Sequence, residues 1–254
     1  MGEANKEAPA KRRPKHNFKW GSIFHTALNF VLPIVLLLLI RSNLEGVAVA
    51  LVILSKWRIF FVQPRHWTTN LKYNSTDLIV KLSTLGFIIQ SDTLNVQLIW
   101  TAWYIFWLIV VKPRSDIVSM GMQAIIGNFL GFSALFQWVD TLNPVIFIVG
   151  AWLIGFSTAG HFLSSYDEPL SRVFAHLWAL FVAQLAWVLS HWVLAYLFIP
   201  QFAIITTLLA YTVASLYHHN YEEKLKPRQL RDQILLTLLI LIVIIAVGDW
   251  TGEV

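Results

Sequence analysis

The chain has 254 residues, of which 57% are hydrophobic and 13% charged, and its mean hydropathy is +0.62. This composition excludes a water-soluble globular protein, because a soluble core of this size could not hide so much apolar surface. The absence of cysteine excludes disulfides, thiolate nucleophiles, iron–sulfur clusters and Cys-ligated zinc. We read the net charge of +5 as basic residues that flank membrane segments, and we expect no nucleic-acid partner.

The apolar runs are long and continuous rather than alternating, which favours membrane-spanning helices over a barrel. Residues 1–19 are polar and basic and predict a disordered cytoplasmic tail. Residues 20–254 predict a single transmembrane helical domain, an all-α bundle. The expected helical segments are 20–40, 44–62, 76–92, 94–111, 116–138, 143–163, 170–198, 200–218 and 231–249.

Two of these segments are also candidates for interfacial or re-entrant helices, because charges interrupt them. Segment 44–62 contains Lys56 and Arg58, and segment 76–92 is short and carries Lys81. If segment 76–92 spans, 17 Lys and Arg fall inside and Arg41 alone falls outside. If it does not, 10 fall inside and 8 outside. The positive-inside rule therefore predicts nine spans, N-in and C-out, with an even number of spans and a cytoplasmic C-terminus as the alternative.

Local patterns add three structural expectations. Ser75, Thr76 and Asp77 are residue types that cap helix starts, so segment 76–92 is expected to begin there. No Asp or Glu is then expected to lie buried near the centre of a segment, which weakens proton- or sodium-coupled transport. A stripe of small residues should place segments 116–138 and 143–163 at the tight centre of the bundle; its members are Ala124, Gly127, Gly131 and Ala134.

A basic and aromatic cluster lies around the loop between the second and third segments. Such a mixture at the cytoplasmic face suits an anionic lipid headgroup or a phosphate-bearing amphiphile. The alternative is that the charges only orient the chain and the aromatic residues form an interfacial belt. The candidate binding residues are Lys56, Arg58, Arg65, His66, Lys72 and Lys81, with Trp57, Trp67 and Tyr73 among them.

A polar stripe follows one side of segment 170–198. Polar groups are costly in lipid, so the stripe is expected to face protein or water, and it would line a pathway or contact a ligand. The alternative is hydrogen bonding between helices. The members of the stripe are Arg172, His176, Gln184, Trp187, Ser190 and His191.

Several histidines are expected at a similar depth toward the cytoplasmic side: His25, His161, His176, His218 and His219. The sequence contains no HExxH motif and no repeated histidine box. We therefore expect hydrogen-bonded interfacial histidines, with no metal and no cofactor.

Three fragments resemble the rhomboid intramembrane serine proteases. His25-x-x-x-Asn29 is similar to the rhomboid oxyanion helix, Gly155-x-Ser157 to the start of the nucleophile motif, and His176 to the catalytic histidine. The resemblance implies a Ser157 nucleophile with His176 as its base and His25 and Asn29 as oxyanion donors. Thr158 replaces the glycine that follows the serine in that motif, and the helix spacing differs. We expect His176 to hydrogen-bond a neighbouring helix instead.

The run KWRIFFVQPRHWTTN, followed by Asp77 and Lys81, resembles an uncharacterised multi-pass membrane protein family of small-genome bacteria. The resemblance implies a protein of the bacterial cytoplasmic (inner) membrane and no particular activity.

The leading functional hypothesis is an integral membrane protein that binds or transports an amphipathic or anionic small molecule, such as a lipid. Its expected partners are membrane lipids with anionic headgroups on the cytoplasmic face, with a membrane-protein partner or a second copy as further candidates. The alternatives are a structural subunit of a membrane complex and an intramembrane serine hydrolase. A continuous polar cavity between the second, third and seventh segments would favour binding or transport.

Overall fold

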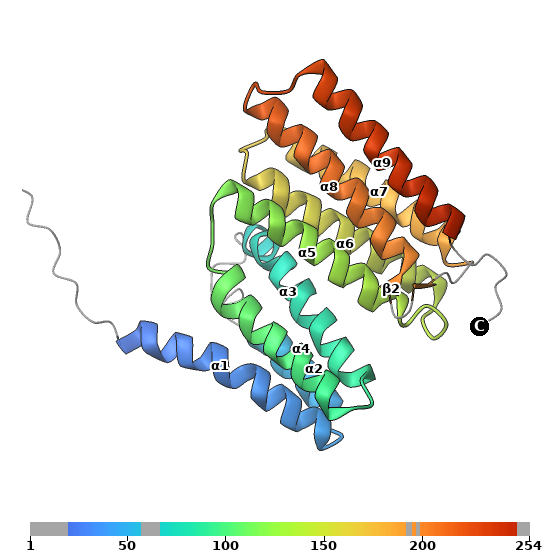
Figure 1. Ribbon diagram of the computed structural model, residues 1–254. Coiled ribbons are helices and arrows are strands. Elements are labelled where there is room, and N and C mark those ends of the chain that lie inside the picture. Colours follow the sequence, from blue (N-terminus) through green and yellow to red (C-terminus); the bar gives the residue numbers. More distant parts are fainter. Residues whose placement is uncertain (1–19, 57–66, 192–194, 197–198, 248–254) are drawn as a thin grey trace, which may run out of the picture.

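The computed structural model describes residues 20–56, 67–191, 195–196 and 199–247, except for the side chains of residues 20–26, 67–73 and 195–196. Within these ranges the regular secondary structure is helical apart from one short pair of strands (Figure 1). The helices are α1 (Trp20–Arg41), α2 (Glu45–Leu54), α3 (Trp67–Gln90), α4 (Leu94–Phe106), α5 (Ile117–Phe136), α6 (Pro144–Ser164), α7 (Ser171–Leu189), α8 (Gln201–Tyr221) and α9 (Pro227–Val247). A five-residue π-helix, Trp107–Val111, continues α4.

The prediction of an all-helical membrane fold is confirmed at this level. Among the described residues, five helices are long and apolar enough to cross a membrane: Leu94–Val111, Ile117–Phe136, Pro144–Ser164, Ser171–Leu189 and Pro227–Val247. Two shorter apolar helices occupy 27–41 and 45–54. These helices indicate an integral membrane protein. The count of nine spans and the orientation of the chain stay predictions.

The seventh segment differs from its prediction at its C-terminal end. Helix α7 stops at Leu189 rather than continuing to 198. Two-residue strands follow, β1 (Ala195–Tyr196) and β2 (Ile199–Pro200), which pair antiparallel. Pro200 lacks a backbone donor and sits immediately before α8, so the chain turns there instead of extending either helix.

The third segment begins earlier than the capping signal predicted. Helix α3 starts at Trp67, so Asp77 is its eleventh residue and is only 8% exposed. Its carboxylate binds side chains rather than the backbone of a helix start. The expectation that no carboxylate lies buried inside a segment is therefore wrong for α3.

Helix α5 packs at the centre of the molecule, between two hydrophobic cores (Figure 1). One core is built mainly by α1 to α4 and the other by α5 to α8. A Cβ atom on Gly131 would lie 2.8 Å from Ile79 Cγ2 of α3 and 2.9 Å from Ile154 Cγ2 of α6. The small side of α5 thus lets helices from both cores approach, as the small-residue stripe predicted.

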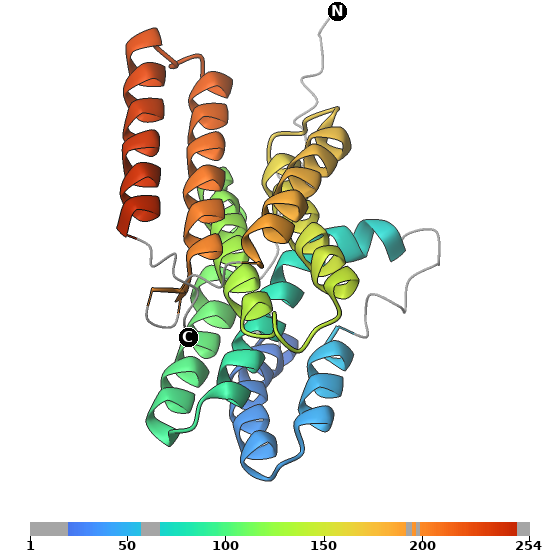
Figure 2. The same cartoon turned by 90° about the vertical axis from the view of Figure 1, so that its right-hand side faces the viewer.

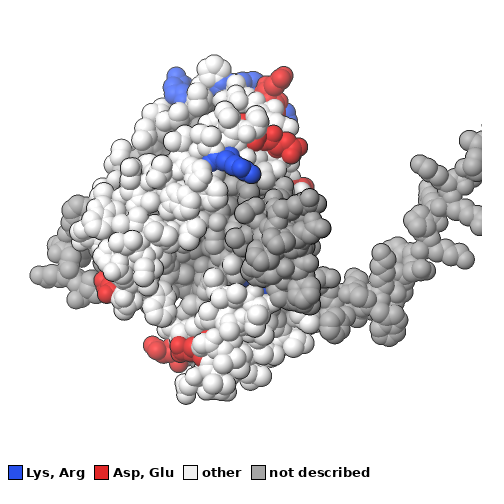
Figure 3. Space-filling view, turned by 180° about the vertical axis from the view of Figure 1, so that it is seen from behind, with Lys and Arg blue, Asp and Glu red and all other residues white. Residues whose placement is uncertain are grey.

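The surface shows a broad uncharged region between charged ends (Figure 3). On this face, the visible Lys and Arg lie mostly toward the end that carries the α8–α9 turn, whereas acidic residues lie at both ends. Helix α9 is the extreme case, because Thr237 is its sole buried residue among those described. Such a distribution is typical of a protein surrounded by lipid.

We predict that Gly131→Ala lowers the free energy of unfolding by about 1–3 kcal/mol, because the added methyl group overpacks the contact with Ile79 and Ile154. Gly46→Ala is the matched control, since a Cβ there would meet nothing within 4 Å. Denaturant unfolding in detergent measures both variants. Equal effects at the two positions would contradict the packing role of Gly131.

Candidate functional site

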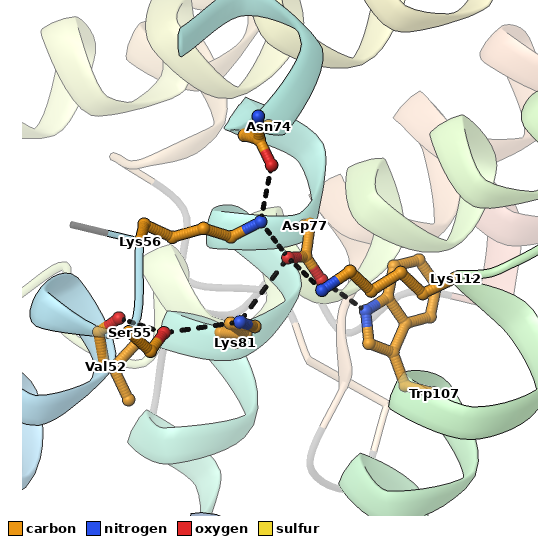
Figure 4. Close-up of polar contacts among 8 residues, drawn as sticks. All are labelled: Val52, Ser55, Lys56, Asn74, Asp77, Lys81, Trp107 and Lys112. Carbon is orange, nitrogen blue, oxygen red and sulfur yellow. Dashed lines mark hydrogen bonds and ion pairs between the residues drawn. The ribbon is translucent and has the colours of Figure 1, made fainter. Parts of the chain in front are cut away.

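The Asp77 carboxylate is surrounded by three lysines (Figure 4). Its Oδ2 atom lies 2.5 Å from Lys56 Nζ, 3.2 Å from Lys112 Nζ and 3.5 Å from Lys81 Nζ. Its Oδ1 atom accepts a 3.0 Å hydrogen bond from the Trp107 indole Nε1. We call Lys56, Lys81, Lys112 and Asp77 the lysine cluster.

Helices α2 and α3 supply one side of the lysine cluster. Lys81 lies four residues after Asp77, so both side chains are on the same face of α3. Lys56 follows the end of α2 and also donates a 2.6 Å hydrogen bond to Asn74 Oδ1 of α3. Lys81 donates to Ser55 Oγ over 3.3 Å, and Ser55 in turn donates to the Val52 carbonyl. The cluster therefore fixes the C-terminal end of α2 against α3.

The π-helix at the end of α4 supplies the other side. Trp107 and Lys112 are five residues apart, which on an α-helix would place them about 140° apart. In the π-helix the Lys112 amide donates to the Trp107 carbonyl over 2.9 Å, so the two residues lie one above the other. Both side chains reach Asp77 as a result (Figure 4).

The lysine cluster is more closed on one side than on the other. The side chains of Lys81 and Lys56 are 4% and 11% exposed, and that of Asp77 is 10% exposed. Lys112 is 31% exposed. A ligand would therefore approach from the side of Lys112.

The structure places some of the predicted basic residues together. Lys56 and Lys81 share the Asp77 carboxylate. Arg58, Arg65 and His66 lie outside the described residues, and so does the side chain of Lys72. Sequence reasoning gave Trp107 and Lys112 no role in the site, because a π-helix leaves no clear signal in an apolar run.

The polar stripe of α7 lies largely on the exposed side of the helix. Arg172, His176, Gln184 and His191 are all exposed, and α7 packs against α6 through its alanines instead. In the described structure, no hydrogen bond or ion pair connects these four side chains with α2 or α3. A binding role for the stripe residues therefore stays a prediction, without a described contact to the second and third segments.

The serine–histidine pair is not formed. Among the described contacts, Ser157 and His176 share no hydrogen bond, and the Ser157 carbonyl accepts a 3.5 Å bond from Thr76 Oγ1. The His176 ring stacks on Trp152 and Phe156 of α6, with centroid distances of 5.4 and 4.6 Å. The expected hydrogen bond from His176 to a neighbouring helix is thus replaced by aromatic packing. The side chain of His25 lies outside the description, and Asn29 is on α1.

The connection between α4 and α5 is held by Gln123 of α5. Its Nε2 atom donates to the carbonyls of Val111 and Arg114, each over 2.8 Å, and its Oε1 accepts from His161 Nε2 over 3.1 Å. Asp116 caps α5 by accepting from the Ser119 amide over 3.0 Å. Hydrogen bonding to the side chain and the amide of Ser119 holds the pKa of the Asp116 carboxyl below its usual value. The end of α4 that carries Lys112 is therefore anchored to α5 and α6.

No protein-family model matches this chain, and no curated protein or solved structure is significantly similar to it. No group of three or more His, Asp or Glu is placed to hold a metal ion within the described ranges.

We predict that Trp107→Phe lowers the free energy of unfolding by about 1–3 kcal/mol, because Asp77 Oδ1 loses its buried hydrogen bond. Trp103→Phe is the matched control on the same helix, since the indole nitrogen of Trp103 has no partner in the described structure. Unfolding of both variants in detergent gives the comparison. A loss of equal size at Trp103 would show that ring size, and not the bond to Asp77, matters.

Proposed function

We propose that the protein is a membrane protein that binds or moves an anionic amphiphile, with the anionic group held at the lysine cluster. The observation that carries this proposal is the charge imbalance around Asp77. Three ammonium groups share one carboxylate, which leaves two positive charges that no other carboxylate of the described residues neutralises. Charges held away from water need compensation, and an anionic ligand would supply it.

Helix ends provide part of that compensation. The cluster lies at the C-terminal ends of α2 and of the π-helix, and each helix end contributes about half a negative charge. About one positive charge then remains. A phosphodiester headgroup carries one negative charge, so a phospholipid or a similar amphiphile matches the cluster.

Lys112 is the residue that tests this proposal with least damage to the fold. It is the most exposed of the three lysines, and its removal leaves Asp77 paired with Lys56 and Lys81. We predict that Lys112→Gln weakens the binding of phosphatidylglycerol to the detergent-purified protein about fivefold, since one cation near a headgroup contributes about 1 kcal/mol. Titration followed by native mass spectrometry measures the change.

Lys224→Gln is the control for the loss of one positive charge, because Lys224 is 70% exposed and pairs with Glu222. It should leave phosphatidylglycerol binding unchanged. Equal weakening by both variants, or equal binding of zwitterionic phosphatidylcholine by the unaltered protein, would refute the proposal.

We also propose nine spans with the N-terminus in the cytoplasm of a bacterial cell and the C-terminus outside. The distribution of Lys and Arg in the sequence supports this arrangement. In it, α3 crosses the membrane and the lysine cluster lies toward the cytoplasmic face.

Cysteine labelling tests this topology without background, because the chain has no native cysteine. Thr93 and Ser115 are exposed and lie in the loops before and after the α4 span. With nine spans, Thr93→Cys should react with an impermeant maleimide on intact cells, and Ser115→Cys only after permeabilisation. Reaction of Ser115→Cys on intact cells would place the 112–116 loop outside and exclude nine spans.

A further inference from the structure

An apolar crevice lies among α5, α6, α7 and α8, on the side of α5 opposite to α4 and the lysine cluster. Its volume is about 510 Å³, which is within the range of ligand pockets. Each helix contributes small or apolar residues, such as Ala124 of α5, Ala159 of α6, Trp178 of α7 and Ala210 of α8. A water-filled channel is not expected in such a lining, because it offers water few polar partners.

The crevice opens sideways between α7 and α8. Phe174, Leu177 and Phe181 of α7 and Val213 of α8 line it, yet these side chains are 43–58% exposed. Figure 2 shows α7 and α8 diverging toward the end where α7 begins and α8 finishes. Helices α5, α6 and α7 are candidate spans, so the opening faces the hydrocarbon of the bilayer.

An aromatic cluster marks the polar end of the crevice. Tyr217 lines the crevice, and its hydroxyl donates to Glu168 in the loop before α7. Tyr166 packs edge-on against Tyr217 and Tyr221, and its hydroxyl lies 2.9 Å from His218 Nδ1. Tyrosines with an apolar ring and a polar tip are typical of the membrane–water interface. The crevice therefore begins at headgroup level and runs into the hydrocarbon region.

We propose that this crevice holds an acyl chain of a membrane phospholipid, which enters from the bilayer between α7 and α8. The chain would lie against α5 and α6, and the ester and headgroup region would lie beside the tyrosines. A phospholipid matches the crevice in three respects: an apolar interior, a lateral opening to lipid, and a polar end at interfacial depth. The site is separate from the lysine cluster and does not depend on the function proposed for it.

Photo-crosslinking tests the proposal on the intact protein in phospholipid vesicles. The probe is a phosphatidylcholine with a diazirine in one acyl chain, and the crosslinked peptides are mapped by mass spectrometry. We expect crosslinks at Ala124 and Thr158, which are 6% and 3% exposed and which a lipid on the outer surface would not reach. Crosslinks restricted to exposed faces such as α9 would overturn the proposal.

Filling the crevice supplies the second arm of the test. Ala159 and Ala210 are half-buried residues of its lining, and changing both to Phe should reduce these crosslinks about tenfold. Ala102→Phe, at an exposed position of α4, is the matched control and should change nothing. Unchanged crosslinking in the filled variant would refute occupancy of the crevice.

The source of the chain is tested with a free fatty acid that carries the same diazirine. Labelling of the crevice by the fatty acid, with none by the phospholipid, would overturn the assignment to a membrane phospholipid. The crosslink map of the unaltered protein decides the matter even if the double variant does not fold.

Discussion

The ion pairs of Asp77 connect the end of α2, the middle of α3 and the π-helix after α4. Without the carboxylate, Lys56, Lys81 and Lys112 would repel one another in a region that water reaches poorly. With it, the end of α2, the middle of α3 and the π-helix after α4 are held at one point. Removing one member of a buried ion pair costs far more than the pair contributes, so the arrangement tolerates the loss of the exposed Lys112 better than the loss of Asp77.

The partners of Asp77 also determine whether its carboxylate can bind a cation. A buried Asp among apolar helices would ordinarily suggest coupling to protons or sodium. Here the three lysines and the Trp107 indole already occupy both of its oxygens, which leaves it little capacity to bind a cation. Asp77 instead determines where the positive charge is concentrated.

Much of the helical architecture could be predicted from the sequence, because long apolar runs leave little choice in lipid. The boundaries of α1, α5 and α6 and the close approach at Gly131 follow from that pattern and from small side chains. The start of α3 could not be predicted, because residues 67–75 are polar and resemble a loop followed by a cap. The lysine cluster was found only in part, since the π-helix that aligns Trp107 with Lys112 depends on backbone geometry rather than on residue type. The neighbours of the α7 stripe could not be predicted for a related reason: periodicity groups polar residues on one side of a helix but does not show which neighbouring element covers them.

The bonds of Gln123 have a mechanical consequence for Lys112. Both amide hydrogens of Gln123 are used by carbonyls on either side of Lys112, and its oxygen is used by His161 of α6. These hydrogen bonds tie the backbone on both sides of Lys112 to α5 and α6. A displacement of α6 would therefore move the Gln123 amide group and, with it, the backbone that carries Lys112, the most exposed lysine of the cluster.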